Sequence, residues 1–426
     1  MAKLQQGNFR IRETAYLDFA TQILQNGIIN DPWLYGEERF LLDAIILTKH
    51  ELKSLFEAAE SIGSLYHEFT EIILKNPHFL ESYFALTPFQ KLMWFSSRGE
   101  WHAISRLDLF LCQNGQIRCC EMNSDTPSGE AETVLLNELL LHAFPSFENP
   151  NADFKSRFLR LVERVSEADV STPKTIGIIY PTEHTEDLSM ILSYEKWLSE
   201  NGFKVLLGSP YNLSCDKNLN LLLFDTKLDL ILRHYKTDWW GERIPIWKDS
   251  EDFADPDPLE NPLLSIIKAE TAGKVKVLNP FGAILTQNKL SMAFFFDFIH
   301  LFSSQSQKTI HDFFPLTRSL RVEDLSNYLS EKNDWVLKSV YGCEGAEVII
   351  GKNVTDEIWQ ETLEKLIPRY WIAQKFFESS TIHSQYPVAN FGVYLCGGIS
   401  SGIFTRLSPS STDFSAKTAP TYIEKN

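Results

Sequence analysis

The stretch AISRLDLFLCQNGQIRCCEMNSD, residues 103–125, decides the fold of the chain and locates its chemistry. Apolar and polar residues alternate on both sides of Asn114-Gly115, a dipeptide typical of two-residue hairpin turns. Most of the sequence before this stretch has apolar residues at helical spacing, so the change of period marks the start of a sheet. The pattern therefore predicts two antiparallel strands joined by a tight turn.

The predicted register places four polar side chains together. A two-residue turn sets Asp108 opposite Glu121 and Arg106 opposite Asn123. Side chains two positions apart share a face of a strand, so all four lie on one face. Two opposed carboxylates repel each other in a bare sheet, and a cation between them removes the repulsion. Carboxylate and amide oxygens suit Mg²⁺ bound together with phosphates, and an arginine fork suits a phosphate or a developing oxyanion.

Two interpretations of this face stay open on the register alone. The first is a metal site. The second is a solvated hairpin face that carries a surface ion pair between Arg106 and a carboxylate. The polar turn Asp125-Thr126-Pro127-Ser128-Gly129 follows directly and offers hydroxyls and amides to a ligand, which favours the metal site.

Length and charge limit the class of protein. The chain has 426 residues, enough for two or three domains at about 100–200 residues each. Its formal net charge of -16 disfavours nucleic acid and anionic lipid as partners, because phosphate groups are bound by clustered Lys and Arg. The charge is compatible with steering of a cationic substrate, and equally with solubility alone.

Targeting signals and cysteine usage indicate a cytoplasmic protein with no membrane partner. Residues 1–16 contain no long apolar core of a signal peptide, and the most apolar run, residues 290–302, is too short to span a bilayer. The six cysteines form no CxxC pair and no zinc spacing, so we expect reduced thiols. Cys119 and Cys120 have no identifiable base, and thiol catalysis is therefore not expected.

The remaining periodicity predicts an α/β chain. Helices are predicted over residues 48–70 and 71–94, near 130–141 and over 188–200, and strands over 175–180, 205–207, 228–232, 336–340, 348–350, 370–374, 390–395 and 400–407. The strand–helix–strand–strand run beginning at residue 175 predicts a small Rossmann-like unit, and without GxGxxG no dinucleotide is expected there. Residues 248–262, rich in Asp, Glu and Pro, predict a loop or lid.

Lys338 is a second chemical signal. It lies inside the apolar strand WVLKSV, residues 335–340, where an ammonium group needs a partner or a route to water. The following loop, Gly342-Cys343-Glu344-Gly345, lets backbone N–H groups approach an anion, although it is not a Walker A loop. Two interpretations stay open: a phosphate site, or a lysine that snorkels beside an ordinary turn.

These pieces occur in the same order in one family. From roughly Tyr16 to Ile423 the chain resembles the synthetase domain of glutathionylspermidine synthase and its stand-alone relatives. The motifs that carry the resemblance are Arg106-Leu107-Asp108, Glu121-Met122-Asn123-Ser124-Asp125, Gln287-Asn288-Lys289, Lys338-Ser339 with Gly342-Cys343-Glu344-Gly345, the segment Tyr370 to Phe377, and the hairpin Asn390 to Arg406. No single motif is highly specific, but the ordered set is.

The resemblance implies an ATP-grasp fold of the α/β (α+β) class that is circularly permuted and carries a Rossmann-like preATP-grasp unit. The metal-binding hairpin comes early and the nucleotide-binding lysine late. We expect residues 1–170 to form a helical region plus the metal-binding hairpin, residues 171–288 the preATP-grasp unit, and residues 289–426 the nucleotide-binding region.

The resemblance also implies residue roles. Asp108, Glu121 and Asn123 would bind Mg²⁺, and Arg106 would stabilise the transition state. Arg406 would reach the transferred phosphate or the acyl substrate, and Thr126 would lie where the family contacts a thiol peptide. The residues expected to hold ATP are Lys289, Lys338, Gly342, Glu344, Gly345, Gln374, Lys375, Phe376, Phe377 and Asn390.

Two positions depart from the family pattern. Ser339 replaces the usual proline, and Cys343 replaces the usual loop arginine. The second change removes a positive charge near substrate or phosphate and leaves the substrate open. The N-terminal Cys/His amidase of bifunctional relatives is not expected in this chain.

The implied activity is an ATP-dependent ligase that joins a carboxylate to an amine through an acyl-phosphate. By resemblance the acid is glutathione or another small peptide, the amine is a polyamine such as spermidine, and a homodimer is one assembly to consider. Three alternatives stay open: a ligase with other peptide or cell-envelope substrates, a nucleotide-binding protein without ligase activity, and a metal-dependent hydrolase. An intact Arg106 argues against binding alone, because binding does not require a transition-state arginine.

Overall fold

The computed structural model describes residues 2–9, 12–167, 174–182, 187–240, 259–342, 347–367, 370–410 and 415–425. The α-helices are α1 (Arg12–Asn26), α2 (Lys49–Lys75), α3 (Phe79–Ser82), α4 (Pro88–Ser96), α5 (Glu130–Leu140), α6 (Phe154–Ser166), α7 (Leu188–Glu200), α8 (Glu260–Thr271), α9 (Ala283–Thr286), α10 (Leu290–Asp297), α11 (Ser304–Phe313), α12 (Leu325–Ser330) and α13 (Asp356–Leu366). Single 3₁₀ turns are Leu141–Ala143, Pro210–Asn212, Thr237–Trp239, Ile299–Leu301, Val322–Asp324, Lys332–Asp334 and Gly351–Asn353.

The strands are β1 (Lys3–Gln5), β2 (Trp33–Leu34), β3 (Glu37–Glu38), β4 (Ala44–Leu47), β5 (Ile104–Leu111), β6 (Ile117–Asn123), β7 (Phe147–Glu148), β8 (Thr175–Ile179), β9 (Lys204–Gly208), β10 (Leu213–Cys215), β11 (Leu221–Leu223), β12 (Thr226–Lys227), β13 (Leu230–Arg233), β14 (Lys276–Leu278), β15 (Thr317–Ser319), β16 (Trp335–Ser339), β17 (Val348–Ile350), β18 (Trp371–Lys375), β19 (Val388–Cys396), β20 (Ile399–Ser408), β21 (Lys417–Ala419) and β22 (Thr421–Glu424). Helices and strands are mixed along the chain, as the sequence predicts.

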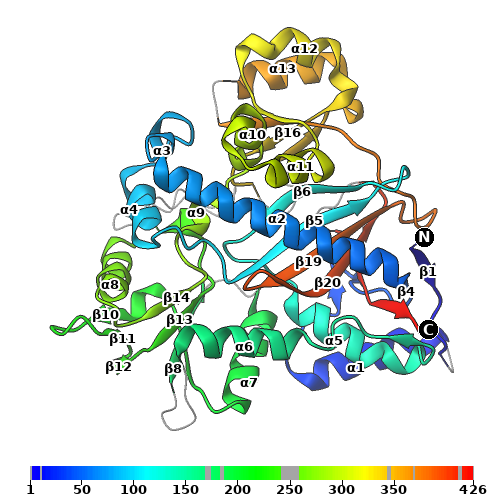
Figure 1. Cartoon of the computed structure of the whole chain (residues 1–426). Coiled ribbons are helices and arrows are strands. Elements are labelled where there is room, and N and C mark those ends of the chain that lie inside the picture. Colours follow the sequence, from blue (N-terminus) through cyan, green and yellow to red (C-terminus); the bar gives the residue numbers. More distant parts are fainter. Residues whose placement is uncertain are drawn as a thin grey trace.

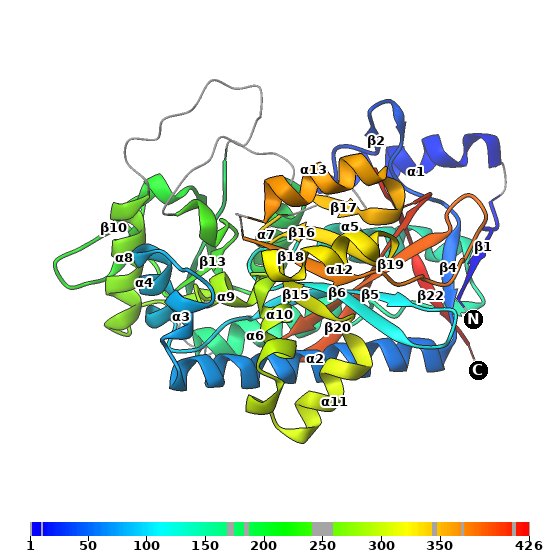
Figure 2. The same ribbon diagram turned by 90° about the horizontal axis from the view of Figure 1, so that it is seen from above.

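The central sheet joins two distant parts of the sequence. Its order is β21-β20-β19-β5-β6, so the early hairpin β5–β6 pairs with strands from the C-terminal end. The long helix α2 crosses one side of this sheet and contacts β19 and β20 (Figure 1). The first and last strands also belong to one sheet, on either side of β4, and the two chain ends lie side by side (Figure 2). This arrangement is the one expected of a circularly permuted chain.

The predicted hairpin has the expected register but a different turn. Arg106 faces Asn123 and Asp108 faces Glu121, which confirms the prediction. The loop itself runs from Gln113 to Gly115, because the amide of Cys112 bonds the carbonyl of Gln116, so the two-residue turn was wrong. Three-residue loops with a glycine at positive φ are the next most common hairpin loops, and Gly115 has φ +78°.

A β-bulge at Cys120 restores the register beyond this longer loop. The pairing shifts between Asp108 and Leu109, which faces Cys119, so Cys120 is the extra residue on β6. Without the bulge, the longer loop would have moved every side chain of β6 to the opposite face. The bulge therefore keeps Glu121 opposite Asp108.

The N-terminal helices follow capping and proline signals. Thr48 caps α2 in a capping box with Glu51, and the buried face of this helix packs into the main core. The single helix predicted over residues 71–94 was wrong: α2 continues to Lys75, and two shorter helices, α3 and α4, follow. Pro77 and Pro88 explain the breaks, because proline lacks a donor and disfavours helix in the residue before it.

The predicted Rossmann-like unit is present. Strands β8, β9, β13 and β14 form a parallel sheet in the order β14-β13-β8-β9, and α7 packs against β9. The loop predicted over residues 248–262 ends earlier than expected, since α8 begins at Glu260; residues 248–258 lie outside the described residues. The division into residues 1–170, 171–288 and 289–426 stays a prediction.

A third sheet carries Lys338. Its order is β15-β18-β16-β17, and α12 and α13 lie beside it in a separate lobe of the molecule (Figure 1). A small core of its own, built around Tyr328, Trp335 and Trp359, stabilises this lobe. Within the described ranges, no helix is both long and apolar enough to cross a lipid bilayer.

Buried polar contacts fasten the Rossmann-like unit to the hairpin. Arg233, at the end of β13, donates to Asp125 with a distance of 2.6 Å between Nη2 and Oδ1, and both side chains are almost fully buried. The Asp125 carboxylate also accepts from the amide of Thr237. Asn279 donates its side-chain amide to the carbonyls of Ile104 and Ser124, so the two units share one set of hydrogen bonds.

We expect Asp125→Ala to lower the free energy of unfolding by about 3–5 kcal/mol, because it leaves the Arg233 charge buried and unpaired. Urea unfolding followed by circular dichroism measures the change. Asp31→Ala is the matched control: Asp31 is 62% exposed and pairs with Arg39, so its loss should cost no more than about 1 kcal/mol. Equal losses in the two variants would contradict this account of the interface.

Candidate active site

A cavity of about 910 Å³ opens where the central sheet, the Lys338 sheet and the turn at residues 126–129 meet. Ligand pockets of proteins hold roughly 300–1,000 Å³, so this one is at the large end. Residues predicted for the site that line the cavity are Arg106, Asp108, Glu121, Asn123, Thr126, Lys338, Gln374, Lys375, Phe376, Phe377, Asn390 and Arg406. Segments more than 200 residues apart in sequence therefore meet at one place.

Asp108 lies at the centre of a cationic cluster. Its Oδ1 accepts from Arg106 Nε at 2.9 Å, and its Oδ2 accepts from Arg406 Nη2 at 2.6 Å and from Asn390 Nδ2 at 3.2 Å. Burial alone would raise the pKa of Asp108, but the two arginines outweigh it and hold the pKa at about 2. The Asp108 side chain is 2% exposed, so the interpretation of this face as a solvated hairpin face was wrong.

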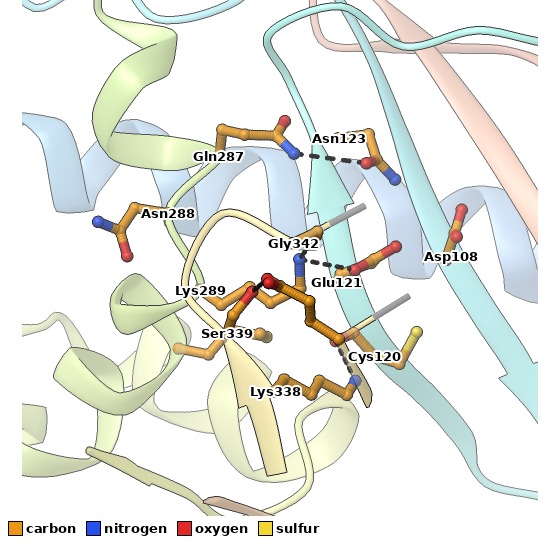
Figure 3. A network of polar contacts seen from close by, with 12 residues as sticks. Asp108, Cys120, Glu121, Asn123, Gln287, Asn288, Lys289, Lys338, Ser339 and Gly342 are labelled. Carbon is orange, nitrogen blue, oxygen red and sulfur yellow. Dashed lines mark hydrogen bonds and ion pairs between the residues drawn. The ribbon is translucent and has the colours of Figure 1, made fainter. Parts of the chain in front are cut away.

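Glu121 faces Asp108 and has a cation of its own. Its Oε2 lies 3.1 Å from the ammonium of Lys289, which also donates to the carbonyl of Gly342 at 2.6 Å (Figure 3). Burial and Asp108 raise the pKa of Glu121, whereas Lys289 and Lys338 lower it more, and the net shift is downward. Both carboxylates are therefore ionised at neutral pH.

Asn123 completes the oxygen donors on this face. Its Oδ1 lies 3.5 Å from Gln287 Nε2, a long contact, and its buried Nδ2 has no partner within the described part of the chain (Figure 3). Gln287 is held in place because its Oε1 accepts from the amides of Ser124 and Asp125. The Asn123 amide is thus free to turn its oxygen toward a cation beside the two carboxylates.

Lys338 is fixed by two oxygen acceptors. Its ammonium donates to Gln374 Oε1 at 2.9 Å and to the carbonyl of Cys120 at 3.2 Å. The bulge that restores the register thus also presents this carbonyl to the lysine. Lys338 is 7% exposed and lines the cavity, so the snorkelling interpretation was wrong.

Arg106 occupies a space that a glycine leaves open. Its Nη1 donates to the carbonyl of Ser128 at 2.7 Å, and its guanidinium lies over the ring of Phe404. Gly392 faces Asp108 on the neighbouring strand, and a Cβ there would lie 2.7 Å from Arg106 Cδ. The guanidinium is thereby aimed along the cavity wall between the carboxylates and the turn at residues 126–129.

The segment Gln374 to Phe377 also lines the cavity. The ring of Phe377 packs edge-on against Phe110, and the Lys352 ammonium lies 3.8 Å from the ring centre of Phe376. Lys375 pairs with Glu331 and lies over the Trp335 ring, so part of its charge is compensated by contacts within the protein. Such an apolar slot with backbone groups at its edge suits a flat heterocycle. Cys343, Glu344 and Gly345 lie outside the described residues.

Comparison with known proteins decides the family. Residues 13–424 match the family described as glutathionylspermidine synthase preATP-grasp. The chain belongs to this family. Family membership makes it an ATP-dependent carbon–nitrogen ligase of the ATP-grasp type. No curated protein sequence matches it significantly.

One of three similar solved structures, the first below, supports the fold. A glutathione synthetase-like effector from Globodera pallida, in its apo form, is 12% identical with a TM-score of 0.57 over 96% of both chains. A candidate gamma-glutamylcysteine synthetase from Methylobacillus flagellatus is 13% identical with a TM-score of 0.46 over 84% of both chains. The ATP-grasp ligase PsnB, complexed with a minimal precursor, is 10% identical with a TM-score of 0.34 over 60% of this chain and 90% of that one.

This glutathionylspermidine synthase relative has cavity residues that its sequence did not reveal. Asp187 accepts from His234 Nε2 at 2.8 Å. Burial raises the pKa of Asp187, but His234, Lys236 and Arg106 together lower it more, so the net shift is downward. Arg39 bonds the buried carboxylate of Glu132 at 2.7 Å and reaches the cavity from the N-terminal region. These residues belong to no motif, and only a predicted contact between distant segments could have found them.

The adjacent thiols of Cys119 and Cys120 in this family member are not suited to catalysis. Burial raises the pKa of the Cys120 thiol to about 12, and burial also raises the pKa of Cys119 well above its usual range. A thiolate is the reactive form of cysteine, so neither residue is a nucleophile near neutral pH.

We expect Gly392→Ala to lower the maximal rate of ligation at least about tenfold, because the added methyl displaces Arg106 and small misplacements in a site cost up to about 100-fold. Nucleotide affinity should change less than about threefold. Steady-state rates and calorimetric nucleotide binding measure the two effects. In the control Gly63→Ala the methyl meets the end of the Leu395 side chain instead, and the rate should stay near wild type. An equal loss of ligation rate in Gly392→Ala and Gly63→Ala would contradict the prediction.

Proposed function

We propose that the protein is an ATP- and Mg²⁺-dependent ligase that joins a peptide carboxylate to an amine through an acyl-phosphate. The observation that carries this proposal is the pair Asp108 and Glu121, opposed in one cavity and surrounded by Arg106, Arg406, Lys289 and Lys338. Such a site is built to neutralise several phosphate charges at once.

The donor set fits a magnesium ion bound together with a nucleotide. Among the described residues, no group of three or more His, Cys, Asp or Glu side chains could hold a metal ion alone. Mg²⁺ is usually bound by one or two carboxylates plus substrate phosphates, and Asp108, Glu121 and the Asn123 amide provide that set. When bound there, Mg²⁺ would neutralise phosphate charge and orient the reacting oxygens.

The proposed reaction has two steps. A carboxylate oxygen of the acyl substrate attacks the γ-phosphorus of ATP, the bond to the bridging oxygen breaks, and ADP leaves. The amine nitrogen then attacks the acyl carbon, phosphate leaves with the bonding electrons, and the nitrogen loses a proton. Neither step needs a cysteine nucleophile, in keeping with the buried thiols.

The chain's own residues position and neutralise the substrates. Lys338 lines the cavity and can transfer its hydrogen bond from Gln374 to a phosphate oxygen. Lys289 does not line the cavity; it pairs with Glu121, and its contact with ATP stays a prediction. Arg106 is held beside Asp108 and the Ser128 carbonyl, so its guanidinium is preorganised for charge that develops in transfer. Arg406 donates to the other oxygen of Asp108 and serves the transferred phosphate or the acyl group.

The substrates follow from the family and from charge. We infer glutathione or a related small peptide as the acid, contacted by Thr126 on the cavity wall, and a polyamine as the amine. The net charge of -16 favours the approach of a polycation. Peptide or cell-envelope substrates are the second candidate, because Cys343 replaces the family's loop arginine and removes a positive charge there. A cytoplasmic location and a homodimer remain part of the proposal.

The first test is ADP release with ATP and Mg²⁺, screened over pairs of small peptides and amines. We expect release that requires both partners of one pair and falls at least about 100-fold in Arg106→Ala, because a preorganised transition-state donor contributes about that much. Arg318→Ala is the control, since Arg318 is an exposed arginine paired with Asp324 at the surface. It should keep the wild-type rate.

Two outcomes would overturn the proposed activity, and a third would overturn the role of Arg106. ADP release without any amine would indicate a hydrolase. Tight nucleotide binding with no pair-dependent release across peptides, amines and cell-envelope precursors would indicate a binding protein. Equal rates in Arg106→Ala and wild type would remove Arg106 from the reaction.

A further inference from the structure

One backbone carbonyl connects Arg106 to a buried tyrosine. The carbonyl oxygen of Ser128 accepts from Arg106 Nη1 at 2.7 Å and from the Tyr394 hydroxyl at 2.6 Å. The opposite edge of the same guanidinium donates through Nε to Asp108. Two contacts therefore fix the plane of the guanidinium, and one of the two acceptors is itself held by Tyr394.

Tyr394 is rigidly placed to hold that carbonyl. It lies in the middle of β19, faces Arg106 on β5 and is fully buried. Its ring packs edge-on against Phe154 with 5.2 Å between ring centres. Burial raises the pKa of Tyr394, so the hydroxyl keeps its proton and is a hydrogen-bond donor at neutral pH.

The turn that carries Ser128 is shaped against this tyrosine. Gly129 has φ +95°, and a Cβ there would lie 3.0 Å from the Tyr394 hydroxyl and 2.8 Å from the Phe404 ring. Thr126 and Ser128 of the same turn line the cavity. The backbone thus approaches the tyrosine as closely as a glycine allows, and the cavity side of the turn stays open to a substrate.

The carbonyl needs this second donor to stay in place. Ser128 lies between strand β6 and helix α5, outside either ladder of hydrogen bonds. Without the tyrosine hydroxyl, its peptide unit would be fixed on this side by the arginine alone, and the arginine would follow the motion of the turn. Sub-ångström placement matters for a group that stabilises developing charge.

We propose that Tyr394 is a positioning residue of the ligase: its hydroxyl fixes the Ser128 carbonyl, and through it the orientation of Arg106 relative to the substrate-facing turn. This inference rests on the proposed function for its catalytic consequence. Tyr394 itself touches neither substrate nor nucleotide, since it does not line the cavity. Its hydroxyl links the turn that faces the acyl substrate to the arginine that meets the transferred phosphate.

Tyr394→Phe tests the inference, since it removes the hydroxyl and keeps the ring. We expect kcat to fall about tenfold while KM for ATP stays within about twofold, because the nucleotide contacts are untouched. Hydrogen exchange of the backbone peptide covering residues 124–130 should become at least about threefold faster in the ligand-free protein.

Tyr422→Phe is the matched control. Tyr422 is fully buried and donates its hydroxyl to the carbonyl of Asn137 at 2.7 Å, but it does not line the cavity. It should lose similar thermal stability without a change in kcat or in exchange of residues 124–130. That difference separates positioning of Arg106 from a general loss of packing.

The outcomes are distinguishable from failure of the proposed function. Unchanged exchange of residues 124–130 in Tyr394→Phe would overturn the inference whatever the activity. Faster exchange with an unchanged kcat would also overturn it, and so would an equal kcat loss in Tyr422→Phe. If the wild-type protein ligates no pair of substrates, the proposed function fails. Faster exchange of residues 124–130 in Tyr394→Phe would then still show that the Tyr394 hydroxyl stabilises the turn.

Discussion

Two carboxylates face each other across neighbouring strands, and the rest of the site depends on the neutralisation of their charges. Asp108 and Glu121 are directly opposed and would repel strongly in a low dielectric if no cation neutralised them. Arg106 and Arg406 neutralise the first and Lys289 the second. Cations also suit the phosphates of a nucleotide, and we propose that Arg106 and Arg406, which line the cavity, serve both the carboxylate pair and an incoming triphosphate.

This constraint explains why distant parts of the chain must meet. The carboxylates come from the early hairpin β5–β6, whereas Arg406 comes from β20 and Lys338 from the separate sheet of β16. Pairing of β5 with β19 brings the two ends of the sequence into one sheet, and the buried Asp125–Arg233 contact fastens the parallel sheet to the same hairpin. A permuted order of elements is therefore no obstacle, because the site depends on sheet register rather than on chain order.

The sequence predicted the local features well and the contacts between them poorly. Alternation around Asn114-Gly115 located the hairpin, and its register placed Asp108 opposite Glu121 correctly even though the turn was wrong, because the Cys120 bulge offsets the longer loop. Neither a bulge nor a three-residue loop has a signal strong enough to read from one sequence. Tyr394 and Gly392 were invisible for a different reason: their meaning depends on a neighbouring strand about 290 residues away. The roles assigned through the family resemblance, including those of Glu344 and Gly345 outside the described residues, remain predictions.

The central claim is that the opposed carboxylates bind the metal of a metal–nucleotide complex. Calorimetric titration of wild type and Glu121→Gln with the ATP analogue AMPPNP, with and without Mg²⁺, tests it most directly. Glu121→Gln keeps the shape of the side chain and removes one negative charge, whose direct ion-pair partner is Lys289. The account predicts that Mg²⁺ strengthens AMPPNP binding at least about tenfold in wild type and by much less in the variant, with both proteins folded. An equal effect of Mg²⁺ on the two proteins would contradict it.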